Sequence, residues 1–206
     1  DRAIIGTFPG KRIDHNYTTN LVDICPVGAF TSKEFRFKQR VWFLQDKPSI
    51  CPGCSTGCAV DVFAKPQERH YYRLKPRFSE VNKYWMCDFG RQQFKHLNPE
   101  FRLPKASLDK SGKQKYCSVS EAISELNTQL KSVSPQETAL LVSAQYTNEE
   151  YEKFFNFFVK EKGIKNVFQW RESTENIKEF DGLLLRGDLN ANTNGLLATM
   201  KKSGLN

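Results

Sequence analysis

Apolar and polar residues alternate differently in the two halves of the chain. From Tyr116 onward, apolar residues recur at helical spacing in some stretches and form short continuous runs in others. Helical spacing predicts amphipathic helices, whereas short apolar runs bounded by polar residues predict buried strands. We therefore expect helices at 119–130, 151–159 and 194–202, and strands at 138–143, 167–170 and 182–186.

Capping residues support these helices. Ser118 with Glu121, and Thr147 with Glu150, match the capping-box pattern, and Gly163 is placed to end the second helix. Because helices and strands alternate, the strands are expected to run parallel in an α/β domain. The aromatic stripe of the second helix is interpreted as core rather than as a cofactor site; it comprises Tyr151, Phe154, Phe155, Phe158 and Val159.

The first half of the chain is poorer in helical patterns. Residues 33–43 alternate between apolar and basic side chains with period two, which predicts a half-buried strand with a basic outer face. Val60 to Leu74 is expected to form a hairpin with its turn at 65–69. Residues 96–114 hold two prolines, a Ser-Gly pair and many charges, and are expected to be a linker between domains.

Composition narrows the class of protein. The 206 residues are 39% hydrophobic and 26% charged, with enough aromatic residues for a folded core. No apolar run approaches the ~20 residues needed to cross a bilayer. The chain opens without a signal peptide or an initiator Met, so we expect it to be an internal fragment of a longer polypeptide.

The chain is basic, with 31 Lys and Arg against 23 Asp and Glu and a net charge of +8. Such a balance is compatible with binding to nucleic acid, to an acidic protein or to an anionic cofactor. It also fits a basic piece of a larger assembly, which the scattered positions of most basic residues favour. The sequence shows no G-x-G-x-x-G, P-loop or H-E-x-x-H motif.

Four of the six cysteines follow a metal-binding spacing. Cys51, Cys54 and Cys58 form C-x2-C-x3-C, and Cys87 follows after 28 residues. Structural zinc usually takes two separate two-cysteine knuckles, whereas three cysteines in one loop plus one distant cysteine suit a [4Fe–4S] cluster. We therefore predict the iron–sulfur cluster, with zinc and structural or disulfide-bonded cysteines as the alternatives.

The two other cysteines differ from this group. Cys25 is followed by Pro, Val and Gly, a sequence typical of the last ligand of a ferredoxin-type cluster; a buried free thiol is the alternative. Cys117 has no cysteine neighbour and is interpreted as structural. The histidines, His15, His70 and His96, are isolated and are interpreted as surface or hydrogen-bonding residues.

At residues 20–30, 35–44, 51–58 and 81–91 the sequence closely resembles the large iron–sulfur subunit of bacterial NADH:quinone oxidoreductase, or complex I. Beyond residue 92 the likeness is looser and extends to the molybdopterin oxidoreductase superfamily. The implied fold class is α+β: a small β-rich [4Fe–4S] domain followed by a truncated α/β domain with a parallel sheet. The implied domains are the end of a ferredoxin-like region (1–45), a cluster domain of the Mo/W bis-MGD type (46–95), a linker (96–115) and the α/β domain (116–206).

The resemblance also implies roles for single residues. Cys25 corresponds to the final ligand of a [4Fe–4S] cluster on the main electron path, whose other ligands would lie outside this sequence. Cys51, Cys54, Cys58 and Cys87 correspond to the ligands of an accessory [4Fe–4S] cluster, which zinc could replace or which could be absent in a fragment. Arg91 is expected to lie in the environment of that accessory cluster and to tune its potential.

The resemblance further implies a place in the cell and a set of partners. The parent enzyme passes electrons from NADH to quinone and translocates protons, so other peripheral-arm subunits are the expected partners. The expected location is peripheral, on the cytoplasmic side of the bacterial inner membrane, without nucleic acid and without direct membrane insertion. The chain alone is expected to relay electrons and to make or break no organic bond.

One departure from the superfamily bears on the cofactor. Molybdenum and tungsten members usually read Cys-x-Lys-Gly-Arg after the fourth cluster ligand, and here Phe89 stands where the Lys would be. An aromatic ring offers no cationic donor, so no functional molybdopterin is expected. The alternatives are a fragment of formate dehydrogenase or another molybdopterin oxidoreductase, and a zinc-stabilised basic module that binds nucleic acid.

Overall fold

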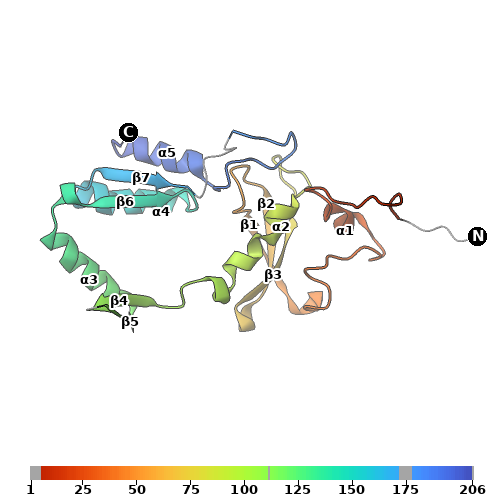
Figure 1. Cartoon of the computed structure of the whole chain (residues 1–206), viewed down its shortest axis with the longest axis horizontal. Helices are drawn as coiled ribbons and strands as arrows, with labels where there is room; N and C mark the ends of the chain where they lie inside the picture. Colours follow the sequence, from red (N-terminus) through yellow and green to blue (C-terminus); the bar gives the residue numbers. More distant parts are fainter. Residues whose placement is uncertain (1–5, 111, 172–177, 206) are drawn as a thin grey trace, which may run out of the picture.

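The computed structural model describes residues 6–110, 112–171 and 178–205. The chain forms a β-rich half around the cysteines and an α/β half, joined by a stretch of short elements (Figure 1). Figure 1 shows the chain leave the β-rich half after α2, pass along β4, β5 and α3, and return towards it between β7 and α5. Within the described residues no helix is long and apolar enough to cross a membrane.

The β-rich half is built on a three-stranded antiparallel sheet in the order β1-β2-β3. Its core contains Val60, Leu74, Met86 and Phe94 together with two of the cysteines. The elements of this half are α1 (Asn20–Ile24), the 3-10 helix η1 (Val41–Phe43), β1 (Gln45–Ile50), β2 (Ala59–Lys65), η2 (Pro66–Glu68), β3 (His70–Pro76), α2 (Asp88–Gln92), η3 (Gln93–Leu97) and η4 (Pro99–Phe101).

The α/β half has a two-stranded parallel sheet, β6 (Ala139–Ser143) and β7 (Asn166–Trp170). The connection between them consists of α4 (Asn148–Phe155) and a wider π-helical turn (Asn156–Glu161), and it ends at Gly163 with φ +75°. Tyr151 and Phe155 are almost fully buried, in a core that also includes Leu196 and Met200. The remaining elements are β4 (Ala106–Lys110), β5 (Lys113–Cys117), α3 (Val119–Ser132), η5 (Pro135–Glu137) and α5 (Thr193–Lys202).

Several predicted elements are confirmed. Both capping boxes form, at Ser118 and at Thr147, and α3, α4 and α5 begin within three residues of their expected starts. The hairpin from Val60 to Leu74 is the β2–β3 pair, and the strands expected at 138–143 and 167–170, β6 and β7, run parallel as expected. The described part of the chain therefore mixes helices with small antiparallel sheets and one parallel sheet.

The strand predicted over 33–43 was wrong. The chain forms turns through this region and the 3-10 helix η1, and Phe37 adopts a left-handed conformation with φ +63°, which ends any extended run. Phe35 instead lies against the guanidinium of Arg73, 4.2 Å from its ring centroid. The edge of the sheet is taken by β1, whose sequence has no apolar alternation and whose residues are all exposed.

Another expectation gains detail, and one needs correction. The linker between domains at 96–114 stays a prediction; this stretch contains the 3-10 helix η4, β4 and the start of β5, and the two strands pair from Ala106 with Cys117 onward. The strand predicted over 182–186 does not form; a single bridge joins Phe180 to Arg186, and the loop between them is shaped by local hydrogen bonds to Asp181.

Candidate metal centre

The C-x2-C-x3-C segment is the turn that joins β1 to β2. Ile50 pairs with Ala59 at the end of the ladder, and the Cys51 N–H donates to the Cys58 carbonyl at 2.9 Å. The turn therefore begins and ends on paired cysteines, and Gly57 inside it has φ +71°, which favours glycine. We call residues 51–58 the cysteine loop.

Cys87 reaches the cysteine loop from the start of a helix. It is the N-cap residue of α2, and its sulfur accepts the Gly90 N–H at 3.3 Å. A Cβ atom added to Gly90 would lie 3.0 Å from the sulfur of Cys51 and 3.4 Å from that of Cys87. The missing side chain of Gly90 thus lets sulfurs from the two segments approach the same small volume.

The four cysteines share one buried environment. Cys51, Cys54, Cys58 and Cys87 are each at most 6% exposed, and none is in a disulfide. Burial raises the pKa of the Cys51 thiol to about 11 and that of the Cys58 thiol to about 12, and the neighbouring cysteines add to both shifts. The pKa of Cys87 is raised, first by burial and also by Cys54.

The donor set is one of four sulfur ligands. Each of the six pairs among the four cysteines contributes to at least one of these pKa shifts. Each thiol is therefore close enough to repel the others as thiolates. Soft thiolate ligands select zinc or iron–sulfur clusters. Among the described residues, no group of three or more His, Cys, Asp or Glu converges to hold a single metal ion. A [4Fe–4S] cube does not require such convergence, because each thiolate binds a different iron.

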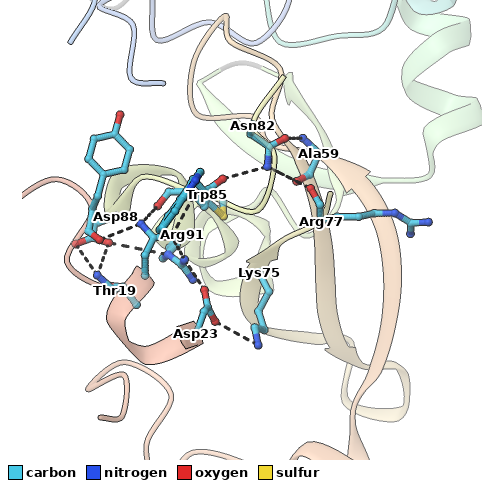
Figure 2. Close-up of polar contacts among 12 residues, drawn as sticks. Thr19, Asp23, Ala59, Lys75, Arg77, Asn82, Trp85, Asp88 and Arg91 are labelled. Atoms are coloured by element: carbon cyan, nitrogen blue, oxygen red, sulfur yellow. Dashed lines mark hydrogen bonds and ion pairs between the residues drawn. The ribbon is translucent and has the colours of Figure 1, made fainter. Parts of the chain in front are cut away.

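Buried asparagines tie the two cysteine segments together, and the sequence interpretation missed them. Asn82 is 1% exposed. Its side chain accepts the Ala59 N–H at 2.9 Å and donates to the carbonyls of Ala59, Arg77 and Trp85 (Figure 2). It thereby links the strand after Cys58 to the segment before Cys87. No spacing rule marks such a residue, because its partners are backbone groups.

Asn20 binds α1 to the segment before Cys87 in a similar way. Its side chain pairs with the backbone of Met86, donating to the carbonyl at 2.9 Å and accepting from the N–H at 3.2 Å. Asp88 accepts the N–H of Thr19 at 3.0 Å (Figure 2). The helix that leads into Cys25 is thus bound to the segment that carries Cys87.

Arg91 also binds α2 to α1. It is 8% exposed, and its guanidinium donates to Asn20 at 2.8 Å and to Asp23 at 2.5 Å. Figure 2 shows Asp23 between Arg91 and Lys75, whose amino group lies 3.2 Å from the carboxylate. The structure therefore directs the charge of Arg91 towards α1, where Asp23 neutralises it.

Phe89, the residue at the position of the superfamily Lys, packs on the cysteine loop. Two carbons of its ring would lie 3.3 Å from a Cβ atom at Gly53. Its contact with Gly53 gives Phe89 a packing role beside Cys54.

Cys25 lies apart from the four-cysteine group, at the C-terminal end of α1. Hydrogen bonds from the following backbone lower the pKa of its thiol, with Phe30 the largest contributor and Ala29, Val27 and Gly28 adding to it. Gly28 has φ +67°, which lets the loop curl around the sulfur. This arrangement stabilises a thiolate, the form in which cysteine binds a metal.

Cys117 and the histidines lie outside the cysteine loop and α2. Cys117 ends β5, is a partly exposed free thiol and directly precedes the N-cap of α3. Each histidine lies beside an aromatic ring: His15 by Tyr17, His70 by Tyr72, and His96 by Phe101.

Comparison with known proteins identifies a matching family model and several relatives. Residues 1–31 match the family model described as NADH-quinone oxidoreductase subunit 3, ferredoxin-like domain. The G-type subunit of NADH-quinone oxidoreductase from Streptomyces coelicolor is 37% identical over 99 residues, 48% of this chain and 12% of the relative. Its counterpart from Rickettsia felis is 32% identical over 141 residues, 68% of this chain and 21% of the relative.

A longer match extends into the α/β half. A second G-type subunit of NADH-quinone oxidoreductase, from Rhizobium meliloti, is 27% identical over 174 residues, which is 82% of this chain and 20% of the relative. The chain thus spans about an eighth to a fifth of the length of the curated relatives described here. The resemblance to the large iron–sulfur subunit is confirmed, at 27–37% identity over part of the chain.

Proposed function

We propose that this chain is an electron-transfer part of the large iron–sulfur subunit of complex I and that the four-cysteine centre holds a [4Fe–4S] cluster. One observation carries the proposal. Four free, buried cysteines from a hairpin turn and a helix start are gathered in one volume without forming disulfides. Thiols with raised pKa values are stable there as thiolates only when a cation compensates their charge, as bound iron does.

The residues of the chain supply the surroundings of the cluster. The sulfurs of Cys51 and Cys87 accept backbone N–H groups of Gly53 and Gly90, and such bonds tune the potential of a cluster. Low exposure of all four cysteines limits access of water. When bound, the cluster supplies one-electron chemistry, and the protein holds its position.

We further propose that Cys25 is one ligand of a second cluster, whose other ligands lie in a part of the parent subunit outside this sequence. The lowered pKa of its thiol, caused first by the backbone N–H of Phe30, and the Cys-Pro sequence at this position support this assignment. Bonds between Asn20 and Met86 and between Arg91 and Asp23 then hold the two centres in fixed relation. The partners would be other peripheral-arm subunits, on the cytoplasmic side of the inner membrane, with NADH as the electron donor, quinone as the acceptor and proton translocation as the coupled work.

The proposed fold of the α/β half is that of a molybdopterin oxidoreductase domain without a working molybdopterin site. The packing of Phe89 on Gly53 supports a structural role at the position where related enzymes place a Lys. Metal analysis of the purified parent complex tests this part of the proposal. About one equivalent of molybdenum or tungsten would overturn it and favour the formate dehydrogenase alternative.

Anaerobic reconstitution tests the metal centre directly. Wild-type protein should take up about four irons and four sulfides per chain and develop broad visible absorption. Cys54→Ser should abolish stable uptake and loosen the β-rich half, because metal binding is coupled to folding. Cys117→Ser is the matched control and should load as wild type does.

The opposing outcomes are distinct. Stoichiometric zinc with no uptake of iron would contradict the cluster and support the zinc alternative. Loss of iron in a Cys25→Ala variant of this chain would show that Cys25 joins the four-cysteine centre.

A further inference from the structure

A segment of the α/β half lies against the cysteine loop although it follows it by more than a hundred residues. The Asp188 carbonyl accepts the N–H of Ser55 at 2.9 Å, and the Leu184 carbonyl accepts the hydroxyl of Thr56. Ser55 and Thr56 lie between Cys54 and Cys58. Residues 181–188, called here the covering segment, therefore bind the part of the loop that carries two of the thiols.

Leu184 adds an apolar contact to these hydrogen bonds. It is 7% exposed and belongs to the same core as Cys51, Cys58 and Met86, whereas its neighbour Leu183 is 62% exposed. Leu184 is thus buried beside the thiols, whereas the preceding residue, Leu183, is exposed.

Tyr17 is a second anchor of the covering segment. Its hydroxyl donates to the Asp181 carboxylate at 2.5 Å and accepts the N–H groups of Leu184 and Leu185, each at 3.0 Å. The other oxygen of Asp181 accepts the N–H groups of Leu183, Leu184 and Leu185 at 2.9–3.1 Å. The segment is therefore a compact turn with its own internal bonds and two separate anchors.

We propose that the covering segment is the third element of the metal centre, which shields the bound cluster and docks the α/β half on it. This inference rests on the proposed function. Since the segment contacts the loop residues between the ligands, a filled centre favours the docked segment, and a docked segment favours retention of the cluster. The two effects must be equal in free energy, because coupling between two sites is reciprocal.

Release of iron tests the proposal in the full chain. Reconstituted wild-type protein, Leu184→Ala and the conservative variant Tyr17→Phe are mixed with an iron chelator, and the loss of visible absorption is followed. Both variants should release iron about tenfold faster than wild type, because their covering segment opens more often. Leu183→Ala, which removes the same side chain at the exposed neighbouring position, should behave as wild type.

Hydrogen exchange supplies the reciprocal measurement. Removal of the metal from wild-type protein should speed exchange at the N–H groups of Ser55, Leu184 and Leu185, while the interior of β6 keeps its protection. Unchanged exchange at these three positions would contradict the coupling.

The outcomes separate the two proposals. If wild-type protein takes up no iron, the proposed function fails. If it takes up iron but all four proteins release it at one rate, the covering role alone is overturned.

Discussion

Gly90 is the residue whose lack of a side chain matters most at the metal centre. A Cβ there would meet the sulfur of Cys51 at 3.0 Å and the terminal carbon of Met86 at 3.2 Å. Replacement by Ala gains up to about 1 kcal/mol in helix propensity, but overpacking of a buried site costs about 1–3 kcal/mol. The second effect is expected to win.

Gly90→Ala should therefore lower the free energy of unfolding of the β-rich half and reduce iron uptake in reconstitution. Gly6→Ala is the control, because nothing lies within 4 Å of an added Cβ at Gly6. Full iron uptake by Gly90→Ala, with unchanged thermal stability, would show that the two segments can separate without loss.

The two cations that bind Asp23 should differ in their contribution to stability. The Arg91 side chain is 8% exposed and that of Lys75 is 37% exposed. Arg91→Ala removes the nearly buried cation that bonds to both Asn20 and Asp23 and should cost about 3 kcal/mol, whereas Lys75→Ala should cost no more than about 1 kcal/mol. Urea unfolding of both variants measures the difference; equal costs would mean that Arg91 is not a structural link.

Among single residues, the sequence identifies candidate metal ligands better than it identifies the residues that hold those ligands in place. The four cysteines could be identified as candidate ligands because the characteristic spacing of metal ligands is visible in the sequence itself. Asn82 and Asn20 could not, because each bonds to backbone atoms of segments brought together only by the fold. Leu184 was taken for part of a strand, and its contact with the cysteine loop depends on the return of the chain after β7.

Among the helices, α4 is bonded to the end of β6 through the hydroxyl of Tyr151, in addition to its apolar packing. The Tyr151 hydroxyl donates to the Ser143 carbonyl at 2.9 Å and accepts the Tyr146 N–H at 3.0 Å. Tyr151→Phe leaves both groups without this partner and should cost about 1–3 kcal/mol in the free energy of unfolding near pH 7. Tyr116→Phe, at a position that is 65% exposed, is the control and should cost little.

The same tyrosine gives a dependence on pH. Burial raises the pKa of Tyr151 above its ordinary value of about 10. The unfolded chain then loses this proton at a lower pH than the folded chain, so the contribution of Tyr151 is complete below pH ~10 and is lost as the pH rises further. The difference in stability between wild type and Tyr151→Phe should narrow from pH 7 to pH 11 in urea titrations; a constant difference would refute this.

Helices with strong local signals were predicted correctly, whereas the strands predicted at 33–43 and 182–186 do not form. Capping boxes and apolar spacing specify α3 and α4 because these signals lie within a few residues. The alternation at 33–43 is equally regular, but β1 occupies the sheet edge and Phe37 turns the chain away. β1 itself escaped prediction because an exposed edge strand needs no apolar pattern.

In the whole molecule, an exposed segment of the chain joins the β-rich half to the α/β half, and the covering segment adds a contact between them. Residues 102–105 are all exposed and lie between η4 and β4, and Leu103 is 94% exposed. Brief digestion with trypsin should cut first after Arg102 or Lys105, because an extended exposed segment fits a protease better than a helix or strand does. A first cut at Lys153, inside α4, would contradict the proposed partition into domains at 96–115.

The order of segments along the chain determines how long the four cysteines precede the covering segment during synthesis. The last cysteine of the centre is Cys87, and the covering segment is completed about a hundred residues later, at Asp188. A ribosome adds about 5–20 residues per second, so the four thiols are made roughly 5–20 s before the segment that closes over them. The nascent chain thus carries the four thiols uncovered for that interval, before Asp188 and Leu184 can bond to Ser55 and Thr56.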